Sequence, residues 1–292
     1  MAVAVLGWGA MGSRIAQRLS QQGHDVTVWN RTPGRAPTEG VTEAETIAEA
    51  VRRSAVVITM VRDDTAIEDI CAGPGGLTAS VLPGAVVVQM STISPAAVER
   101  LRADLPGGVD LVDAPVLGSG AEAGAGSLTI LAGGDPSVLQ RCAPVLEALG
   151  TVKHVGPVGA GTAAKLVANS ALFGVLAVLG ESLALARGLG LDAGTAFDVL
   201  GTTALAAQAE RRRPAIERDE YPPRFLLSLA RKDADLAQDA ARTAHVAIPA
   251  LAAARSWLAE AEAAGWGALD YTALLRTILT SRDATSHPEP GT

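Results

Sequence analysis

Short apolar runs alternate with helical patterns through the first 150 residues of the chain. Each run is almost continuously apolar, which is typical of strands in a parallel sheet that helices cover on both faces. Alternation of such strands with amphipathic segments indicates repeated βαβ units and therefore a doubly wound α/β domain. The predicted strands are residues 2–7, 25–30, 55–61, 85–91, 109–116 and 127–133, and the predicted helices include 11–22, 43–52 and 95–105.

The pattern changes after Gly161, where no further strand is predicted. One long apolar helix is expected first, and proline and glycine then separate shorter helical segments. The predicted helices are 162–188, 193–219, 224–245, 248–264 and 270–281. We therefore expect a dinucleotide-type domain at 1–161, an interdomain helix at 162–188, an all-α domain at 189–281 and a disordered polar tail at 282–292.

Composition narrows the class of protein. A net charge of −7 argues against a surface that binds nucleic acid or an anionic membrane. The most apolar stretch, 171–179, is much shorter than the ~20 residues that a membrane span needs, and the N-terminus lacks a signal-peptide pattern. Cys71 and Cys142 have no metal-ligand spacing and fit a reducing compartment. A cytoplasmic protein without a metal site is expected.

A glycine-rich loop joins the first predicted strand to the first predicted helix. It reads Gly7-Trp8-Gly9-Ala10-Met11-Gly12. In such loops the first glycine permits a tight turn, the second allows the backbone to approach a pyrophosphate, and the third lets the helix pack closely on the strand. The helix N-terminus adds partial positive charge and N–H donors. Because strand and helix flank the loop as required, we predict a dinucleotide site.

The end of the second predicted strand indicates which dinucleotide binds. NAD-specific sites usually place a carboxylate there, which accepts a hydrogen bond from the ribose 2′-hydroxyl. This chain has Asn30, Arg31 and Thr32 instead, a cation beside two hydrogen-bonding side chains. A guanidinium pairs well with a 2′-phosphate, although Arg31 could also be an ordinary loop arginine. NADP(H) is therefore preferred, with NAD(H) possible.

Five segments together resemble the β-hydroxyacid dehydrogenase family, which includes 3-hydroxyisobutyrate dehydrogenases and glyoxylate and succinic semialdehyde reductases. More distant members of the group are 6-phosphogluconate dehydrogenase and imine reductases. The resemblance covers residues 1 to about 280, and the segments occur in the family's order: 7–12, 89–95, 113–119, 156–169 and 232–233. It implies a Rossmann-type N-terminal domain, a helical C-terminal domain and an intertwined homodimer.

The resemblance also implies roles for individual residues. Lys165 and Asn169 match the family's catalytic lysine and asparagine, and Lys232-Asp233 matches a pair that closes over nicotinamide and substrate. Thr92 would lie beside the nicotinamide end of the cofactor, and Val61 is expected among the cofactor contacts. The substrate carboxylate would bind at Leu117, Gly118 and Ser119, together with Asn169 and Lys232.

Two departures from the family pattern affect the expected substrate pocket. The family usually has Ser-Gly-Gly where this chain has Leu117-Gly118-Ser119. It also usually has Asn three residues after the lysine, where this chain has Ala168. Both changes make the pocket less polar, so the family's substrates cannot be assigned to this chain directly. The loop from Gly118 to Gly126 is still expected to offer backbone N–H groups to a carboxylate.

The chemistry of a carbonyl reduction favours Lys165 independently of the resemblance. The protein must supply a proton and stabilise the developing alkoxide, and a lysine ammonium can do both, whereas arginine does not readily release its proton. Only three of the 24 Lys and Arg residues are lysines, and Lys165 and Lys232 are two of these. Lys165 and Asn169 are four residues apart, so they share one face of the predicted helix.

We therefore predict an NADP-dependent oxidoreductase that converts a small carboxylate-bearing aldehyde or ketone into a hydroxy acid, with Lys165 as general acid and base. One alternative is an imine reductase, which usually has Asp or Tyr in place of the lysine. The second is a cofactor-binding module without catalytic activity. Retention of Lys165 and Asn169 argues against both alternatives.

Overall fold

The computed structural model describes residues 1–34 and 39–281, so the tail predicted at 282–292 lies outside the described residues. The chain divides into two compact units, Met1–Ala168 and the part from Asn169 on. The strands of the first unit are β1 (Ala2–Leu6), β2 (Asp25–Trp29), β3 (Val41–Glu43), β4 (Val56–Thr59), β5 (Val86–Gln89), β6 (Asp110–Asp113), β7 (Val116–Leu117), β8 (Leu128–Gly133) and β9 (Gly150–Gly156).

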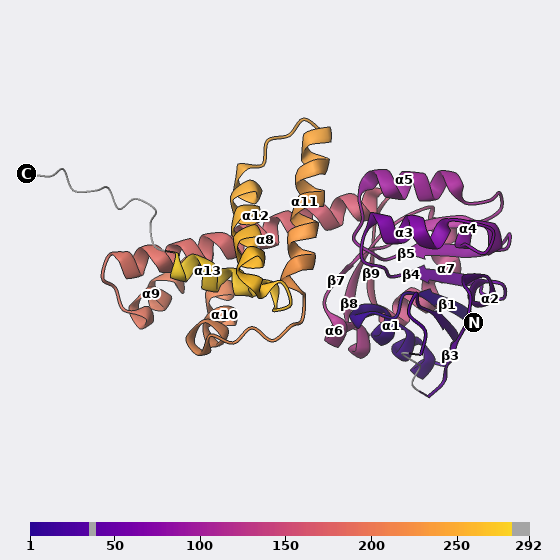
Figure 1. Cartoon of the computed structure of the whole chain (residues 1–292), viewed down its shortest axis with the longest axis horizontal. Coiled ribbons are helices and arrows are strands. Elements are labelled where there is room, and N and C mark those ends of the chain that lie inside the picture. Colours follow the sequence, from indigo (N-terminus) through magenta and orange to yellow (C-terminus); the bar gives the residue numbers. More distant parts are fainter. Residues whose placement is uncertain (35–38, 282–292) are drawn as a thin grey trace, which may run out of the picture. The chain divides into compact units, whose positions relative to one another are not determined.

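Helices cover this sheet on both faces, which confirms the predicted α/β class. The helices are α1 (Ala10–Gln21), α2 (Ile47–Val51), α3 (Asp64–Cys71), α4 (Leu77–Ser80), α5 (Pro95–Asp104), α6 (Gly120–Ala125), α7 (Pro136–Leu149) and the first turns of α8 (Ala160–Gly188). One core packs α1, α6 and α7 on the sheet, and a second core packs α2, α3, α4 and α5 on its other face (Figure 1). Both cores consist mainly of Val, Ile, Leu and Ala.

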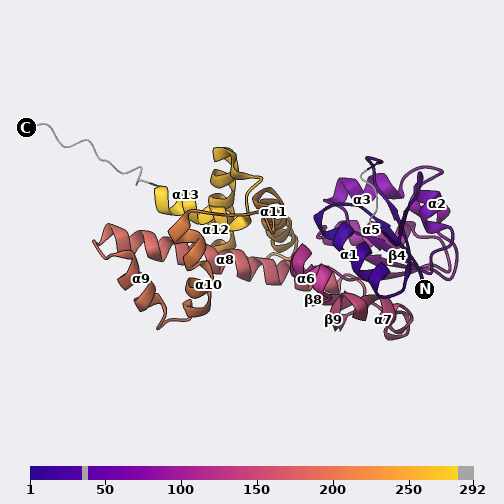
Figure 2. The ribbon, with the colours of Figure 1, turned by 90° about the horizontal axis from the view of Figure 1, so that it is seen from below.

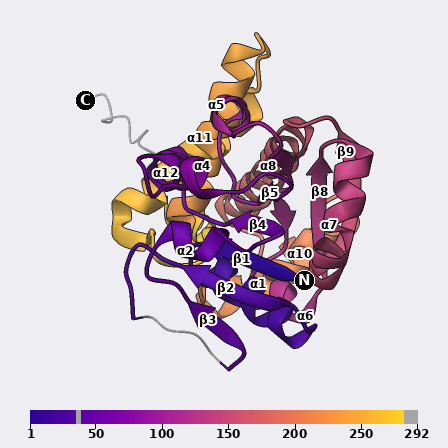
Figure 3. The same cartoon turned by 90° about the vertical axis from the view of Figure 1, so that its right-hand side faces the viewer.

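The strands follow the order β3-β2-β1-β4-β5-β6-β8-β7, with β9 paired to β8. The strands from β3 to β6 pair in parallel. The chain places β2 and β3 on one side of β1 and then returns to place β4, β5 and β6 on the other side, so the strand order reverses between β1 and β4. β3 and β9 lie toward opposite edges (Figure 3). In open parallel sheets, ligands bind at the carboxyl ends of the strands beside such a reversal.

The far side of the sheet differs from the all-parallel prediction. β8 pairs antiparallel with β6 and β7, and only β9 is parallel to it. The connection from β6 to β8 contains β7 and the six-residue α6, which form no crossover of the kind that a parallel pair needs. The chain therefore returns beside β6 in the opposite direction, and the sheet is mixed.

Several elements of this unit differ from the sequence prediction. The helix predicted over 43–52 begins only at Ile47, because Thr46 caps it, and Glu43 ends β3 instead. β9 was not predicted, and none of its residues is buried, as in an edge strand that lacks a continuous apolar run. α3, α4, α6 and α7 were also not specified from the sequence.

The second unit is helical, as predicted. It contains the rest of α8, α9 (Ala193–Leu200), α10 (Ala206–Arg218), α11 (Leu227–Thr243), α12 (Pro249–Ala261), the π-helical turn η1 (Glu262–Trp266), the 3₁₀ turn η2 (Tyr271–Ala273) and α13 (Leu274–Thr280) (Figure 2). The helix predicted over 193–219 is two helices, separated at 201–205. Within the described residues of this unit, β-type pairing is limited to an isolated bridge between Leu226 and Asp270.

Side-chain contacts join the helices of the second unit. The rings of Phe173, Phe225 and Tyr271 form a cluster with centroids 5.4 to 6.4 Å apart. The buried carboxylate of Asp270 accepts hydrogen bonds from the backbone of Phe225 and Thr272. Burial of these rings and satisfaction of the backbone donors fix the turn before α11 against α8.

α8 covers the helix predicted over 162–188, and its apolar character extends beyond the stretch 171–179. By length and composition alone it could cross a membrane, and it is the one helix of the described residues that meets this test. Such a single helix is weak evidence, because a core helix of a globular protein meets the same test. Val167, Val178 and Leu185 on α8 are 71%, 47% and 63% exposed, so part of its apolar surface is uncovered.

The N-terminal turn of α8 packs against the sheet with almost no space. A Cβ added at Gly161 would lie 2.2 Å from the carbonyl oxygen of Asp113 and 2.5 Å from that of Leu131, whereas a Cβ at Gly174 of the same helix would meet nothing within 4 Å. We expect Gly161→Ala to lower the free energy of unfolding by about 1–3 kcal/mol or more, because backbone atoms must move.

Gly174→Ala is the matched control, and it should raise stability by about 0.5–1 kcal/mol, since alanine favours the helix. Urea denaturation of the two variants measures both effects. Equal midpoints for both variants would contradict the close packing at Gly161.

Candidate functional site

The glycine-rich loop follows β1 and has the geometry that a dinucleotide needs. Gly7 has φ +116, and a Cβ there would lie 2.2 Å from the carbonyl oxygen of Met60. A Cβ at Gly12 would lie 2.0 Å from the carbonyl oxygen of Gly7, so α1 packs directly on the turn. At Gly9, which caps α1, a Cβ would meet no protein atom within 4 Å. The missing side chain at Gly9 therefore leaves space for a ligand and is not required by packing.

The N-terminus of α1 suits an anion. Gly9 provides no side-chain cap, and the first turn, which contains Ala10 and Met11, has no acidic residue. The dipole of this 12-residue helix is thus directed at the open space beside Gly9 without a competing carboxylate. Among the described residues, no group of three or more His, Cys, Asp or Glu side chains could hold a metal ion.

Asn30, directly after β2, joins this loop to the next one. Its amide oxygen accepts a hydrogen bond from the backbone N–H of Trp8 at 3.2 Å, and its amide nitrogen donates to the carbonyl of Thr32 at 2.9 Å. Both ends of the amide are therefore engaged in holding backbone. Arg31 and Thr32 are exposed, so their side chains are accessible to a ligand.

Buried polar side chains fix the turns after β4 and β5. The Gln89 amide accepts from the backbone N–H of Ser91 at 2.6 Å and donates to the Ser91 carbonyl at 2.8 Å. The Ser91 hydroxyl in turn accepts from the backbone N–H of Val61 at 2.9 Å. Val61 and the neighbouring Thr92, both half-buried, are thereby held at the same edge of the sheet as Gly7.

Lys165 lies in the first turns of α8, half-buried against the connection between β6 and β8. Its Nζ donates to the carbonyl oxygen of Val116 at 2.8 Å. Leu117 and Gly118 follow directly, and Gly118 adopts φ +132. The structure therefore brings the predicted proton donor to the predicted substrate segment.

The segment from Gly118 to Gly126 is not the open loop that we expected. Gly120–Ala125 form α6, and Ser119 and Glu122 form a capping box at its start. The Glu122 carboxylate accepts from both the N–H and the hydroxyl of Ser119, at 2.7 and 2.5 Å. These two donors are committed to the helix start, which makes them poor candidates for binding a carboxylate.

In the second unit, Asn169 and the Lys232-Asp233 pair lie together. Asn169 and Asp233 are 1% and 2% exposed. The Asn169 amide nitrogen donates to Asp233 Oδ2 at 2.9 Å, and Lys232 Nζ lies 2.8 Å from Asp233 Oδ1. Because a carboxylate only accepts hydrogen bonds, this contact fixes which end of the Asn169 amide faces it. Sequence analysis placed Asp233 among the cofactor contacts and did not suggest this link.

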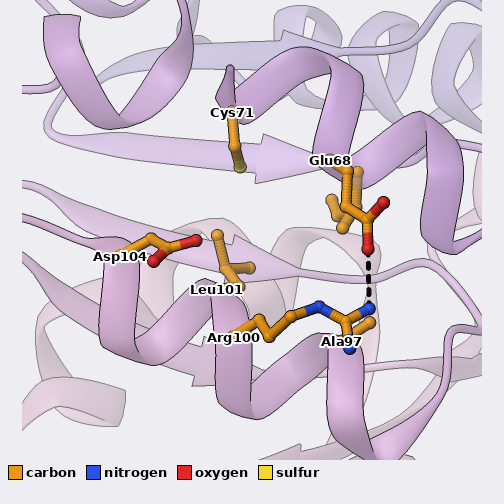
Figure 4. A pocket seen from close by; sticks show the side chains of 7 residues that line it. Glu68, Cys71, Ala97, Arg100, Leu101 and Asp104 are labelled. Carbon is orange, nitrogen blue, oxygen red and sulfur yellow. Dashed lines mark hydrogen bonds and ion pairs between the residues drawn. The ribbon is translucent and has the colours of Figure 1, made fainter. Parts of the chain in front are cut away.

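A small pocket between α3 and α5 lies elsewhere in the first unit (Figure 4). It has a volume of about 100 Å³, and the ion pair of Arg100 with Glu68 crosses it. It is lined by residues of these two helices alone, Ile67, Glu68 and Cys71 of α3 and Ala97, Arg100, Leu101 and Asp104 of α5, and by no residue of the glycine-rich loop. Burial raises the pKa of the Cys71 thiol to about 11, so this cysteine is protonated near neutral pH. We assign no function to this pocket.

Sequence analysis missed the residues that hold the candidate site together. Gln89, Ser91 and Asp113 belong to the quoted motifs, but the hydrogen bonds of Ser91 with Val61 and of Asp113 with Thr162 span 30 and 49 residues and leave no local pattern. Asp64 was not considered, although its carboxylate accepts from the N–H and hydroxyl of Ser94. Only the serine-glutamate spacing of Ser119 and Glu122 was readable as a capping box.

Two family models match the chain. Residues 2–159 match the NAD-binding domain of 6-phosphogluconate dehydrogenase. Residues 159–278 match the corresponding C-terminal model, described as NAD-binding of NADP-dependent 3-hydroxyisobutyrate dehydrogenase. Together they extend over both units of the structure.

Known proteins resemble the chain over almost its full length. It is 32% identical to the 3-sulfolactaldehyde reductase of Escherichia coli, with 98% of each chain covered. It is 30% identical to glyoxylate/succinic semialdehyde reductase 1 of Arabidopsis thaliana, over 97% of this chain and all of the relative.

Solved structures agree with these relatives. The Mycobacterium tuberculosis 3-hydroxyisobutyrate dehydrogenase with L-serine matches with a TM-score of 0.86 and 30% identity, covering 94% of this chain and 98% of that one. An imine reductase from a Pseudomonas species matches with a TM-score of 0.61 and 28% identity, covering 94% and 98%. The chain belongs to the β-hydroxyacid dehydrogenase family and is an NAD(P)-dependent oxidoreductase of the hydroxyacid dehydrogenase type.

Proposed function

We propose that this enzyme uses NADP(H) to interconvert a small carboxylate-bearing aldehyde or ketone with the corresponding hydroxy acid, and that Lys165 is its general acid and base. The observation that carries the proposal is the position of Lys165. Its Nζ is held at 2.8 Å from the carbonyl of Val116, directly before the predicted substrate residues Leu117, Gly118 and Ser119.

A bound reduced nicotinamide supplies a hydride to the carbonyl carbon. The chain must then supply the proton and stabilise negative charge on the carbonyl oxygen. Lys165 would donate that proton from Nζ during reduction and accept it from the hydroxyl during oxidation. The Val116 carbonyl restricts the positions that the Lys165 Nζ can take. The side chain therefore loses less conformational entropy when Nζ binds the substrate oxygen.

Asn169 and Lys232 would hold the substrate. Asp233 accepts from the amide nitrogen of Asn169, so the amide oxygen faces away from Asp233 and would accept from the substrate hydroxyl. Lys232, whose Nζ lies 2.8 Å from Asp233 Oδ1, would supply the positive charge that attracts a substrate carboxylate. Asp233 thus supports both groups, and we propose no cofactor contact for it.

The cofactor would bind along the edge of the sheet that carries the glycine-rich loop. The N-terminus of α1 and the open space at Gly9 suit the pyrophosphate, and Arg31 is exposed where the 2′-phosphate of NADP would lie. We assign Asn30 mainly to holding the two loops, because both ends of its amide are engaged. The residues proposed to contact the cofactor are Gly7, Gly9, Ala10, Met11, Gly12, Arg31, Thr32, Val61 and Thr92.

We propose a homodimer in the cytoplasm. Val178 and Leu185 of α8 are 47% and 63% exposed, and a second copy of the chain would cover this apolar surface. The two cysteines are unpaired, which fits a reducing compartment. A monomeric mass by sedimentation equilibrium at micromolar concentration would contradict the dimer, and recovery in a membrane or secreted fraction would contradict the location.

Reduction of imines is the second candidate function. A family member with that activity shares the fold, and Leu117 and Ala168 make the expected pocket less polar than the family pattern. Lys165 argues against it, because a carboxylic acid or phenol usually takes that position in imine reductases. A non-catalytic cofactor-binding module is disfavoured by retention of Lys165, Asn169 and their hydrogen bonds.

The experiment that tests the proposed function is a substrate series with NADPH. It compares α- and ω-oxo acids with their methyl esters, beside a cyclic imine. A site with buried polar partners rejects analogues that lack the matching group much more strongly than an apolar pocket rejects changes in length. We expect the free acids to be reduced, the esters to react at least ~10²-fold more slowly, and chain length to matter less. Equal rates for acids and esters would support a neutral carbonyl or imine substrate.

Lys165→Ala should reduce kcat by at least ~10²-fold while NADPH binding is preserved, since general acid–base catalysis contributes on that scale. Lys165→Arg should be nearly as slow, because the charge remains but the proton is not released. Steady-state kinetics and cofactor titration measure both quantities. An arginine variant with most of the wild-type activity would reduce Lys165 to an electrostatic role.

Arg31→Ala should weaken NADPH binding by about 10- to 10²-fold and leave NADH binding unchanged, because the lost interaction is with the 2′-phosphate. Fluorescence titration of each reduced cofactor gives the dissociation constants. Arg62→Ala, another exposed arginine on the loop after β4, is the control and should change neither. Equal wild-type affinity for NADPH and NADH would refute the preference.

A further inference from the structure

Asp113, at the carboxyl end of β6, is completely buried, and its carboxylate reaches the first turn of α8. Its Oδ2 accepts from the backbone N–H of Thr162 at 2.6 Å, and its Oδ1 accepts from the Thr162 hydroxyl at 2.8 Å. Burial raises the pKa of Asp113, while hydrogen bonds from Thr162 and from the backbone of Gly159 act in the opposite direction. The buried carboxylate thus depends on the start of α8 for its hydrogen-bond partners.

α8 has no cap of its own, which explains why a strand residue serves it. Gly159 occupies the N-cap position, because its carbonyl accepts from the N–H of Ala163 at 3.0 Å, and glycine has no side chain to accept from the first-turn donors. α7, by contrast, is capped by the residue that precedes it, Asp135. In α8 the Thr162 N–H, which a local cap would otherwise satisfy, is satisfied by Asp113.

The same segment holds α8 a second time. Asp113 accepts from Thr162. Val116, three residues after Asp113, accepts from Lys165, three residues after Thr162. Two contacts about one turn apart fix both the height and the rotation of the helix start. Gly161, directly before Thr162, leaves no room for a shift toward the strand.

We propose that Asp113 is a positioning residue that sets the place of the Lys165 ammonium through the first turn of α8. The inference rests on the proposed function in so far as Lys165 is the proton donor. Removal of the Asp113 carboxylate would release the first turn of α8. The Nζ of Lys165 would then no longer be held at a fixed position relative to the Val116 carbonyl. The effect should appear in kcat and in the reactivity of the Lys165 amine, and it should leave the cofactor loop unchanged.

The test compares Asp113→Asn, which keeps the shape and one acceptor, with Asp113→Ala. Asp135→Ala is the control, since it removes a capping carboxylate from the start of another helix of the same unit, α7. We expect kcat to fall by about 10-fold in the asparagine variant and by about 10²-fold in the alanine variant, the scale of a small misplacement of a catalytic group. NADPH affinity should stay within about 2-fold of wild type, and the control should keep its kcat.

A second readout does not depend on turnover. Acylation of the three lysines by an amine-reactive ester, followed by mass spectrometry, reports Lys165, Lys232 and the exposed Lys153 separately. In Asp113→Asn the rate at Lys165 alone should rise severalfold. An acylation rate at Lys165 equal to that of the wild type, together with wild-type kcat, would overturn the proposal. A rise of equal size at all three lysines would also overturn it, because that result reports general unfolding.

The double variant Asp113→Asn/Lys165→Ala separates this inference from the proposed function. If Asp113 acts through Lys165, the double variant is no slower than Lys165→Ala alone. A further loss in the double variant would show that Asp113 acts by another route and would overturn the positioning role. An active Lys165→Ala enzyme would instead refute the catalytic role of Lys165, while the acylation rates would still decide whether Asp113 positions its amine.

Discussion

Parallel pairing places the ends of strands that are distant in sequence at one edge of a sheet, and the cofactor side of this enzyme depends on that constraint. β1 pairs with β2 and β4, and β4 pairs with β5, all in parallel. Gly7, Asn30, Val61 and Thr92 each follow one of these strands within three residues. Their proximity therefore follows from hydrogen bonding between backbones, before any side chain of the site contributes.

The loops at that edge are held by hydrogen bonds of polar side chains, which are buried at Gln89, Ser91 and Asp113 and half-buried at Asn30. Asn30 joins two loops through both ends of one amide, and Gln89 and Ser91 join the turns after β4 and β5. Asp113 does the same between β6 and α8. In a low-dielectric interior such bonds are strong, and leaving any partner unsatisfied is costly. The site is thereby formed before a ligand arrives.

The features that sequence analysis recovered are those with a local pattern. The glycine loop was predicted because backbone crowding at Gly7 and Gly12 permits no other residue, and the long apolar helix because its composition differs from everything before it. The features it missed depend on distant partners or on competing signals. α6 was taken for a loop because glycine is frequent in it, although the Ser119–Glu122 spacing marks a helix start. The break at Gly201 was overlooked because the helical pattern continues on both sides.

The sequence motifs name Lys165, Asn169 and Lys232 together, but they do not reveal that Asp233 accepts a hydrogen bond from Asn169. Its partner Asn169 is known only once α8 and α11 are folded together, since a spacing of 64 residues carries no periodic signal. The same applies to the bond of Asp113 with Thr162 across 49 residues. Sequence periodicity identifies which face of an element is buried, whereas the partner of a buried polar group comes from the tertiary structure.

The contact of Asn169 and Lys232 with one buried carboxylate also limits how this enzyme can evolve. Loss of Lys232 would remove the counter-ion of the buried Asp233 carboxylate, and breaking a buried ion pair typically costs about 3–5 kcal/mol, out of a total stability of about 5–15 kcal/mol. Loss of Asn169 would remove a hydrogen bond to the same charge, which typically contributes about 1.5–3 kcal/mol. A substitution at any one of the three positions is therefore tolerated more easily when the other two change with it. The three positions form a single heritable unit, whereas Leu117, which takes no part in this contact, can vary independently of it.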